Sequence, residues 1–417
     1  MEIMYLFGLI VSSIKLTQAR TMISLLRIMR SLEMYQELNR NQKKQRFLQM
    51  KASNTKVITP DMLTLAREYR GITQKDLALA SGITQSQIAQ MENGIASSAS
   101  EETIEIVLNQ LGFPREFFEL DECKTGFGSS SVFYRKKTRL TAANRRVIQS
   151  KVNLHRIALK RVLDMVDIED NTNLPFVDIE DSNNTPEDAA NIIRSSWNIP
   201  DGPISNLTKY IENAGIIVIE CDFETRYIDG TTLFSKDTPP IIYINKDLPA
   251  DRYRFTLAHE LGHLIMHEHH SEQMEEEADS FASELLLPKS LFSAHAARIG
   301  NSPTLGDIAK LKSFWKVSMA AIIERLYRLN YINADKKKNL YIMMNQKKIR
   351  QVEPLLFEKE SPRLLQEMIY VLCDDIGSNI KNISQFILLP QDVLQDIYST
   401  IKAPFTAVKS TSHLKVI

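Results

Sequence analysis

The chain has 417 residues, with 51 Lys or Arg against 51 Asp or Glu, and 43% of its residues are hydrophobic. This composition excludes wholesale disorder, and at roughly 150 residues per domain the length indicates about two or three domains. The three cysteines (Cys123, Cys221 and Cys373) are far apart and form no CxxC pair. This excludes a disulfide framework and a cysteine zinc knuckle, and it fits a reducing cytoplasm.

The first 56 residues differ in character from the rest of the chain. Their longest apolar stretch, Met4 to Ile14, is much shorter than the roughly 20 residues that a membrane-spanning helix needs. We therefore expect no membrane anchor. Met50 opens a stretch that is typical of a normal start, so we interpret residues 1–56 as a poorly ordered extension and leave Met1 or Met50 open as the true start.

Residues 57–120 carry the pattern of a small all-helical domain. The segment Thr73 to Gly94 scans as helix, turn, helix. Thr73 caps the first helix, the turn falls at Ser81 to Ile83, and Thr84 with Gln87 forms a capping box for the second helix. The predicted core of the domain is apolar: Leu63, Leu65, Leu77, Ala78, Ile83, Ile88, Met91, Ile104, Val107, Leu108 and Leu111.

This pattern resembles the XRE or Cro/repressor type of DNA-binding domain. The resemblance implies that Gln74 touches phosphate, and that Gln85, Ser86 and Gln87 face base edges in the major groove. DNA is therefore an expected partner, and a homodimer is an expected assembly.

The charge of the same segment argues against tight DNA binding. No Lys or Arg stands between Lys75 and Arg115, although phosphate neutralisation supplies most non-specific affinity. The alternative is a module for dimerisation or for docking a partner repressor. Residues 121–175 follow as a basic linker helix: a flexible break at Gly126 to Ser131 precedes a basic stretch from Arg135 to Met165, for which we expect a solvated face.

A second domain is predicted at 176–333, where Thr185 and Pro186 start a helix. Candidate strands then lie at Gly215 to Phe223, Thr231 to Ser235 and Ile241 to Asn245, and helices resume from Arg252. The predicted fold class is α+β, with the all-helical domain first, a mainly helical domain with a small β-sheet second, and a helical C-terminal region at 334–417.

The strongest chemical motif is HELGH at His259 to His263. Four residues advance a helix by slightly more than one turn, so both imidazoles can converge on a single ion. Glu260 lies about 100° around the same helix, outside the ligand set. From there it can take a proton from a water molecule that attacks a carbonyl.

Two residues compete as the third ligand. His269 has the spacing of the metzincin pattern, but Met266 stands where that pattern needs a glycine. Glu275 opens a second amphipathic helix, where Asp279 shares its face and can hold a ligand imidazole. We prefer Glu275. The neighbouring carboxylates Glu276 and Glu277 are interpreted as a solvated helix start, and the histidines His267, His269 and His270 as a solvated helix end.

The stretch FTLAHELGHLIMH, followed by ExxxD and LLLP, resembles the ImmA/IrrE family of bacterial metallopeptidases over about residues 185–330. The resemblance implies a zincin-like fold, zinc held by His259, His263 and Glu275, and Glu260 as the catalytic residue. It also implies a cytoplasmic protein that promotes cleavage of a helix-turn-helix repressor.

Two functions follow from these motifs. The first is a zinc-dependent endopeptidase that cuts itself, a partner repressor or an antitoxin, selected by the tethered helix-turn-helix. The alternative is a non-proteolytic transcription regulator or antitoxin-like protein that uses the metallopeptidase fold as a sensor. An intact Glu260 favours the first, because a pure sensor needs no base.

Overall fold

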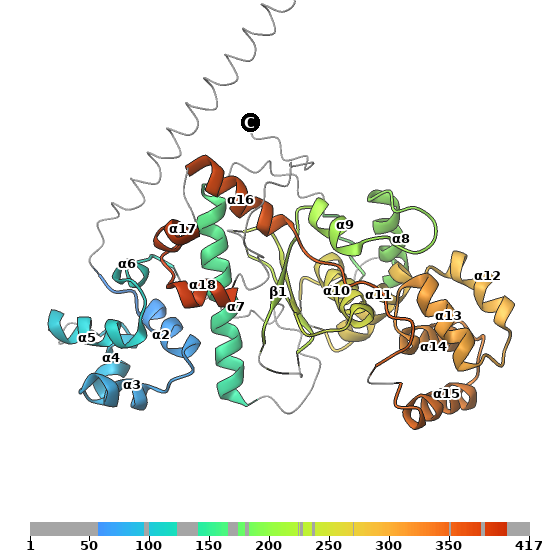
Figure 1. The fold of residues 1–417 in the computed structure, drawn as a ribbon, viewed down its shortest axis with the longest axis horizontal. Coiled ribbons are helices and arrows are strands. Elements are labelled where there is room, and N and C mark those ends of the chain that lie inside the picture. The colour runs from blue at the N-terminus through green and yellow to red at the C-terminus, as the bar shows by residue number, and fades with distance from the viewer. Residues whose placement is uncertain are drawn as a thin grey trace, which may run out of the picture.

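The structure is a computed structural model that describes residues 57–95, 100–122, 141–165, 174–179, 183–223, 225, 228–235, 238–269, 271–349, 352–376 and 380–397. Figure 1 shows a group of short helices on one side, a long helix beside a small sheet in the middle, and further helices on the other side. The predicted α+β class is confirmed. The expected extension at 1–56 lies outside the described residues. Within the described part of the chain, no helix is long and apolar enough to cross a membrane.

The first group contains the predicted helix-turn-helix. Both capping interactions are present, because Thr73 pairs with Asp76 and Thr84 pairs with Gln87. Gly82 has a φ of +67°, the left-handed conformation that a tight turn between two helices favours. The predicted core is buried, except that Ile83 and Ile104 are only partly covered. The helices of this group are α2 (Pro60–Tyr69), α3 (Gln74–Ser81), α4 (Gln85–Glu92), α5 (Glu101–Leu111) and α6 (Arg115–Phe118).

The long helix α7 (Ala142–Leu163) packs against α2 and is buried through most of its length. The expectation of a solvated face is therefore wrong for the middle of the basic stretch. Its charges are buried with partners: Lys151 Nζ donates to the carbonyl of Asp222 at 3.2 Å, and Arg156 pairs with Glu122 at 3.1 Å. The flexible break predicted at 126–131 lies outside the described residues.

A mixed sheet of three strands follows: β1 (Ile217–Cys221), β2 (Gly230–Leu233) and β3 (Ile241–Asn245). The strand order is β1-β3-β2, with β1 parallel and β2 antiparallel to β3. One face, which includes Ile219 and Tyr243, joins the core of α7 and the helix-turn-helix. The other face, which includes Val218 and Ile242, joins the core around α10. Burial on both faces explains why β1 and β3 are mostly apolar along their length.

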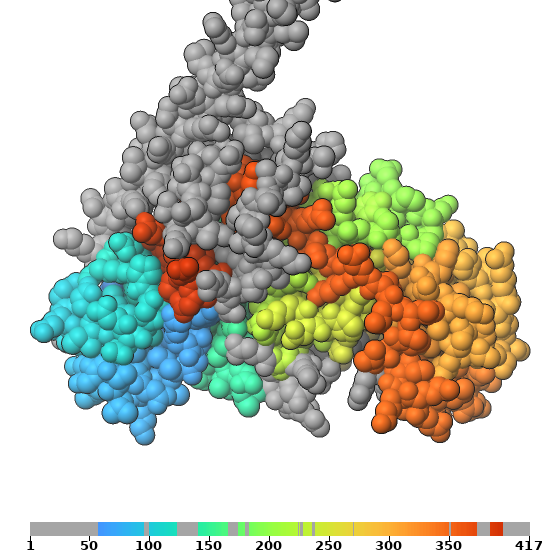
Figure 2. All heavy atoms as spheres, viewed as in Figure 1, coloured from blue at the N-terminus to red at the C-terminus, as the bar shows by residue number. Residues whose placement is uncertain are grey.

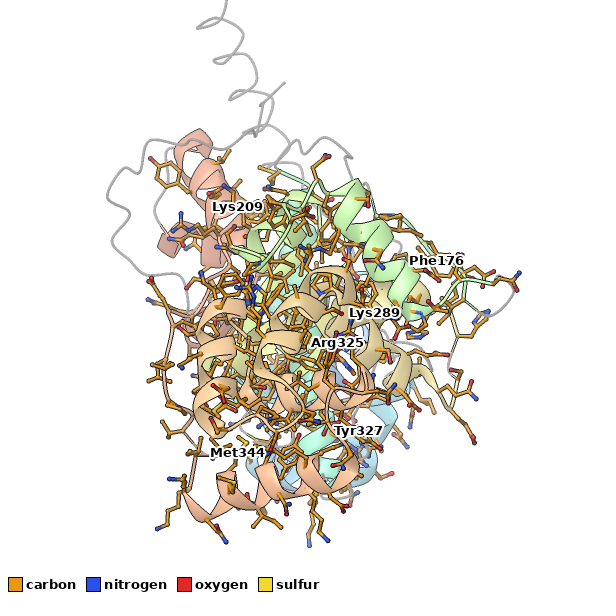
Figure 3. All side chains as sticks on the ribbon, turned by 90° about the vertical axis from the view of Figure 1, so that its right-hand side faces the viewer. Phe176, Lys209, Lys289, Arg325, Tyr327 and Met344 are labelled. Carbon is orange, nitrogen blue, oxygen red and sulfur yellow. The ribbon has the colours of Figure 1, made fainter. Side chains whose placement is uncertain are left out.

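The helices beyond the sheet carry the HELGH motif and its neighbours. The helix α8 begins at Pro186 as the sequence predicted, and Thr185 caps it through a capping box with Asp188. Arg325 on α14, labelled in Figure 3, donates to the carbonyl of Leu287 at 3.0 Å and pairs with Glu284, which anchors the C-terminal end of α11. The helices are α8 (Pro186–Ser196), α9 (Leu207–Asn213), α10 (Ala250–Met266), α11 (Met274–Leu286), α12 (Lys289–Ile299), α13 (Leu305–Trp315), α14 (Met319–Arg328) and α15 (Ala334–Gln346).

The C-terminal region returns across the molecule. Figure 2 shows its orange-red residues running from the α12–α15 side toward the middle. Residues 352–363 are held by buried charges: Glu360 pairs with Arg254 of α10 and accepts from the Thr208 backbone at 2.8 Å, and Glu353 pairs with Lys312 at 2.8 Å. The helices α16 (Leu364–Ile376), α17 (Ile380–Ile387) and α18 (Gln391–Ile397) then contribute to the core that contains α7.

Candidate metal centre and nucleic-acid-binding helix

The candidate metal centre lies where α10 packs against α11. Gly262, the glycine of HELGH, allows the two helices to approach each other closely. A Cβ at this position would lie 3.0 Å from the Phe281 ring and 3.4 Å from the Ala278 Cα, which is tighter than ordinary van der Waals contact. The missing side chain therefore lets the first turn of α11 reach the histidines of α10.

Three side chains converge at this contact. The Nε2 atoms of His259 and His263 are 3.1 Å apart. Glu275 of α11 places one carboxylate oxygen 3.6 Å from His263 Nε2 and the other 3.8 Å from His259 Nε2. In the described part of the chain, these residues are the one group of three whose donor atoms could hold a metal ion.

The donor set fits zinc in both chemistry and spacing. Two imidazoles and one carboxylate are a common catalytic zinc set, with a fourth position open. Donor atoms at zinc distances in a tetrahedron are about 3.3 Å apart. The two Nε2 atoms, 3.1 Å apart, are close to that value, and one donor atom from each of the three residues lies within 4.8 Å of the others.

Asp279 supports one of the two imidazoles. Its Oδ1 is 2.9 Å from His259 Nδ1, so the carboxylate holds the hydrogen on Nδ1 and directs Nε2 toward the cluster. Burial acts to lower the pKa of His259, but the Asp279 hydrogen bond and the charges of Glu260 and Glu275 outweigh it and raise the pKa. Burial and repulsion from His259 and His267 hold the pKa of His263 well below its usual range.

His267 and Glu277 are not the solvated residues that the sequence predicted. The His267 side chain is 1% exposed; its Nδ1 lies 3.0 Å from His263 Nδ1, and its Nε2 lies 3.0 Å from Glu277 Oε2. The expectation fails because the chain leaves the helical conformation at His267, whose ring contacts His263 of α10. His269, the competing ligand, is exposed and outside the cluster, and His270 lies outside the described residues.

Glu260 is buried next to the ligands and is held from the sheet side. The Thr232 hydroxyl of strand β2 donates to Glu260 Oε2 at 2.8 Å. Gly230 of the same strand leaves room for the carboxylate, because a Cβ there would lie 3.1 Å from Glu260 Oε1. Burial raises the pKa of Glu260 to about 7, a value suited to a general base. No sequence signal indicates either of these β2 residues, because their proximity to α10 depends on strand order.

The helix-turn-helix presents only part of the predicted DNA-contacting set. Gln85 and Ser86 are exposed at the start of α4. Gln87 accepts from the Thr84 backbone at 2.9 Å through its side-chain oxygen, so the capping box engages that atom. Gln74 donates through Nε2 to Glu92 at 2.8 Å. For bidentate contact with adenine, the Gln87 side chain would have to break its hydrogen bond to the Thr84 backbone.

Two family models match the chain. Residues 63–118 match the helix-turn-helix model, and residues 211–327 match a peptidase family model described as the IrrE N-terminal-like domain. The chain joins a helix-turn-helix domain to an IrrE-like metallopeptidase domain. The resemblance seen in the sequence is thereby confirmed, and the pairing supports a transcription regulator that carries a metallopeptidase-type domain. No curated protein matches the chain.

Proposed function

We propose that this chain is a zinc-dependent endopeptidase that regulates transcription. The observation that carries the proposal is the convergence of His259, His263 and Glu275 with a buried carboxylate, Glu260, immediately beside them. Two imidazoles, one carboxylate ligand and a separate carboxylate base make up the group set of a hydrolytic zinc site.

The chain's own residues divide the work at this site. When bound, zinc would act as a Lewis acid on the peptide carbonyl and lower the pKa of a water molecule. Glu260 would accept the proton of the attacking water at its carboxylate and deliver it to the leaving amine. Thr232 would hold Oε2 of that carboxylate in place, and Asp279 would hold His259 in the tautomer that presents Nε2.

The substrate we propose is a protein with a helix-turn-helix, such as a repressor or an antitoxin, or this chain itself. The helix-turn-helix would either bind DNA or dock such a partner. Weak DNA binding is favoured, because Gln85 and Ser86 are exposed while the domain supplies few cations. We further propose that the protein acts in the cytoplasm, where DNA and such partners are present.

Replacing the base tests the proposal. We expect purified Glu260→Gln to retain zinc at the wild-type level, because Glu260 is not a ligand, and to lose at least about 100-fold of the cleavage rate. Proteomic comparison of cells that express each form would then reveal a protein cleaved only by wild type. The control is Glu276→Gln, which changes an exposed acid on α11.

Zinc content separates the parts of the proposal. Glu275→Ala should lose zinc and His269→Ala should keep it; the reverse result would overturn the ligand assignment. A wild type that holds zinc and leaves the same cellular proteins intact as Glu260→Gln would support the non-proteolytic regulator instead.

A further inference from the structure

The two imidazoles of the candidate metal centre have different neighbours at their Nδ1 atoms. His259 has the carboxylate of Asp279 at 2.9 Å. The neighbour of His263 is a histidine instead, because Nδ1 of His267 lies 3.0 Å from its own Nδ1. Glu277 stands behind that second ring, with Oε2 3.0 Å from His267 Nε2.

The backbone explains how His267 reaches this position. The helix α10 ends at Met266, and His267 is extended, with φ of −118° and ψ of 114°. Its backbone N–H still donates to the carbonyl of His263 at 3.2 Å. The ring therefore lies next to the His263 ring, with their centres 5.1 Å apart and an angle of 49° between the ring planes.

The hydrogens in this chain of contacts can be assigned from donor chemistry. An ionised carboxylate only accepts, so the hydrogen between Glu277 and His267 belongs to His267 Nε2. A neutral imidazole with its hydrogen on Nε2 has a lone pair on Nδ1. That lone pair accepts from Nδ1 of His263. The Nε2 of His263 is then left with a lone pair, and it is the atom that lies 3.6 Å from Glu275.

We propose that His267 and Glu277 are positioning residues that fix the ring orientation and the tautomer of the metal ligand His263. The inference rests on the proposed metal site. In this arrangement, each imidazole ligand has a support that ends in a carboxylate of α11: Asp279 acts directly on His259, and Glu277 acts through the imidazole of His267 on His263.

Residues that orient a histidine ligand raise its affinity for the metal without touching the metal, and losing one such residue costs about 10- to 100-fold. A role limited to folding predicts a different pattern, because a helix-end contact would affect stability and not the spectrum of the bound ion. The test therefore measures metal affinity and coordination as well as the stability of the protein.

The experiment uses full-length protein with Glu277→Leu, His267→Leu, the double variant, and Glu277→Gln, which keeps an oxygen that can accept from His267 Nε2. Zinc affinity is measured by competition with a chromophoric chelator, and the visible spectrum is recorded with Co²⁺ in place of zinc. Glu276→Leu is the matched control, since Glu276 is exposed and precedes Glu277 on α11.

We expect Glu277→Leu and His267→Leu to weaken zinc binding by about 10- to 100-fold and to shift the Co²⁺ spectrum, while thermal unfolding of the metal-free protein changes little. The zinc affinity of the double variant should be no lower than that of the weaker single variant, because the two residues act in series. Glu277→Gln should bind zinc within about threefold of wild type, because the acceptor is retained.

Each other outcome overturns the inference. Wild-type affinity in both Leu variants would show that His263 needs no support from this side. A Glu277→Gln as weak as Glu277→Leu would show that charge, and not the acceptor, matters. A wild type that binds no zinc would overturn the proposed function together with this inference, whereas zinc binding with unaffected Leu variants overturns this inference alone.

Discussion

At the scale of single residues, the candidate site is defined by what surrounds Glu260. The carboxylate is buried, so its orientation depends on the few polar groups that reach it. Thr232 provides one hydrogen bond, at 2.8 Å, and the absence of a Cβ at Gly230 provides the space. These two residues come from an edge strand that is about 30 positions away in the sequence, yet they determine where a proton acceptor points.

The Thr232→Val substitution tests this arrangement. Valine has the same shape without the hydroxyl, so we expect cleavage of the target to slow by about 10- to 100-fold, corresponding to the loss of a hydrogen bond to a charged group. Zinc content should stay at the wild-type level. The measurement is kcat/KM together with metal analysis.

Thr231→Val is the matched control, because Thr231 pairs with Tyr243 on the opposite face of the sheet from Glu260. Its cleavage rate should remain near that of wild type. Cleavage by Thr232→Val at the wild-type rate would show that Glu260 needs no support from strand β2.

At the scale of elements, carboxylates join the C-terminal region to the metallopeptidase-type domain, and one of them is the half-buried Glu212. Glu212, at the end of α9, accepts from the backbone N–H groups of Arg363 and Leu364 at 2.9 Å each. It thereby covers the start of α16, whose first N–H groups have no partner inside the helix. Burial raises the pKa of Glu212 to about 7, against the opposing effect of these hydrogen bonds.

The raised pKa predicts a stability that depends on pH. Between an ordinary carboxyl pKa of 4.5 and about 7, the folded protein binds the proton of Glu212 more tightly than the unfolded chain does. The free energy of unfolding should therefore fall as the pH rises through this window. Glu212→Gln lacks this titrating group. The free energy of unfolding of the variant, relative to that of wild type, should therefore rise by up to about 3 kcal/mol between pH 4 and pH 8.

Denaturant unfolding of both proteins at several pH values measures the difference directly. The exposed Glu116, changed to Gln, serves as a control that should show no such window. A constant difference between wild type and Glu212→Gln across pH would mean that Glu212 has the same pKa in the folded protein as in the unfolded chain.

At the scale of the whole molecule, the helix-turn-helix and the metallopeptidase-type domain share a core. Residues of α2, α7, one face of the sheet and α16–α18 form one continuous apolar cluster. The sequence led us to expect a helix-turn-helix joined to the second domain only by a tether. In the described residues the two domains instead pack against one shared core. Deleting residues 57–120 would uncover the face of α7 that α2 covers, so point substitutions are the cleaner test of the helix-turn-helix.

The exposed residues of α4 give that test. We expect a Gln85→Ala, Ser86→Ala double variant to weaken binding to segments of the chain's own promoter by about tenfold or more at low salt. The salt dependence should be unchanged, because neither residue is charged, whereas Lys75→Ala should reduce it.

Fluorescence anisotropy across a salt series distinguishes these effects, with Gln110→Ala, which changes an exposed residue of α5, as a neutral control in the same domain. If wild type binds no promoter segment even at low salt, the helix-turn-helix would instead be a docking module. Equal affinities for wild type and the α4 double variant would place DNA contacts elsewhere.

Several features of this protein followed from the sequence by itself, because local chemistry determines them. The capping residues Thr73, Thr84 and Thr185 begin their helices as predicted, since a cap depends only on residues within one turn. The strand Ile241–Asn245 has the predicted bounds. The four-residue spacing of His259 and His263 sufficed to bring both imidazoles to one face of a helix.

Other features depended on tertiary structure, because they arise from elements far apart in the chain. The middle of the basic stretch, within α7, was predicted to have a solvated face; it is buried, and Asp222 and Glu122 reach its charges from other segments. His267 and Glu277 were also predicted to be solvated. That prediction failed because sequence periodicity indicates a helix and its end, but not what packs against that end. Only the contact of α10 with α11 brings these two residues to the candidate metal centre.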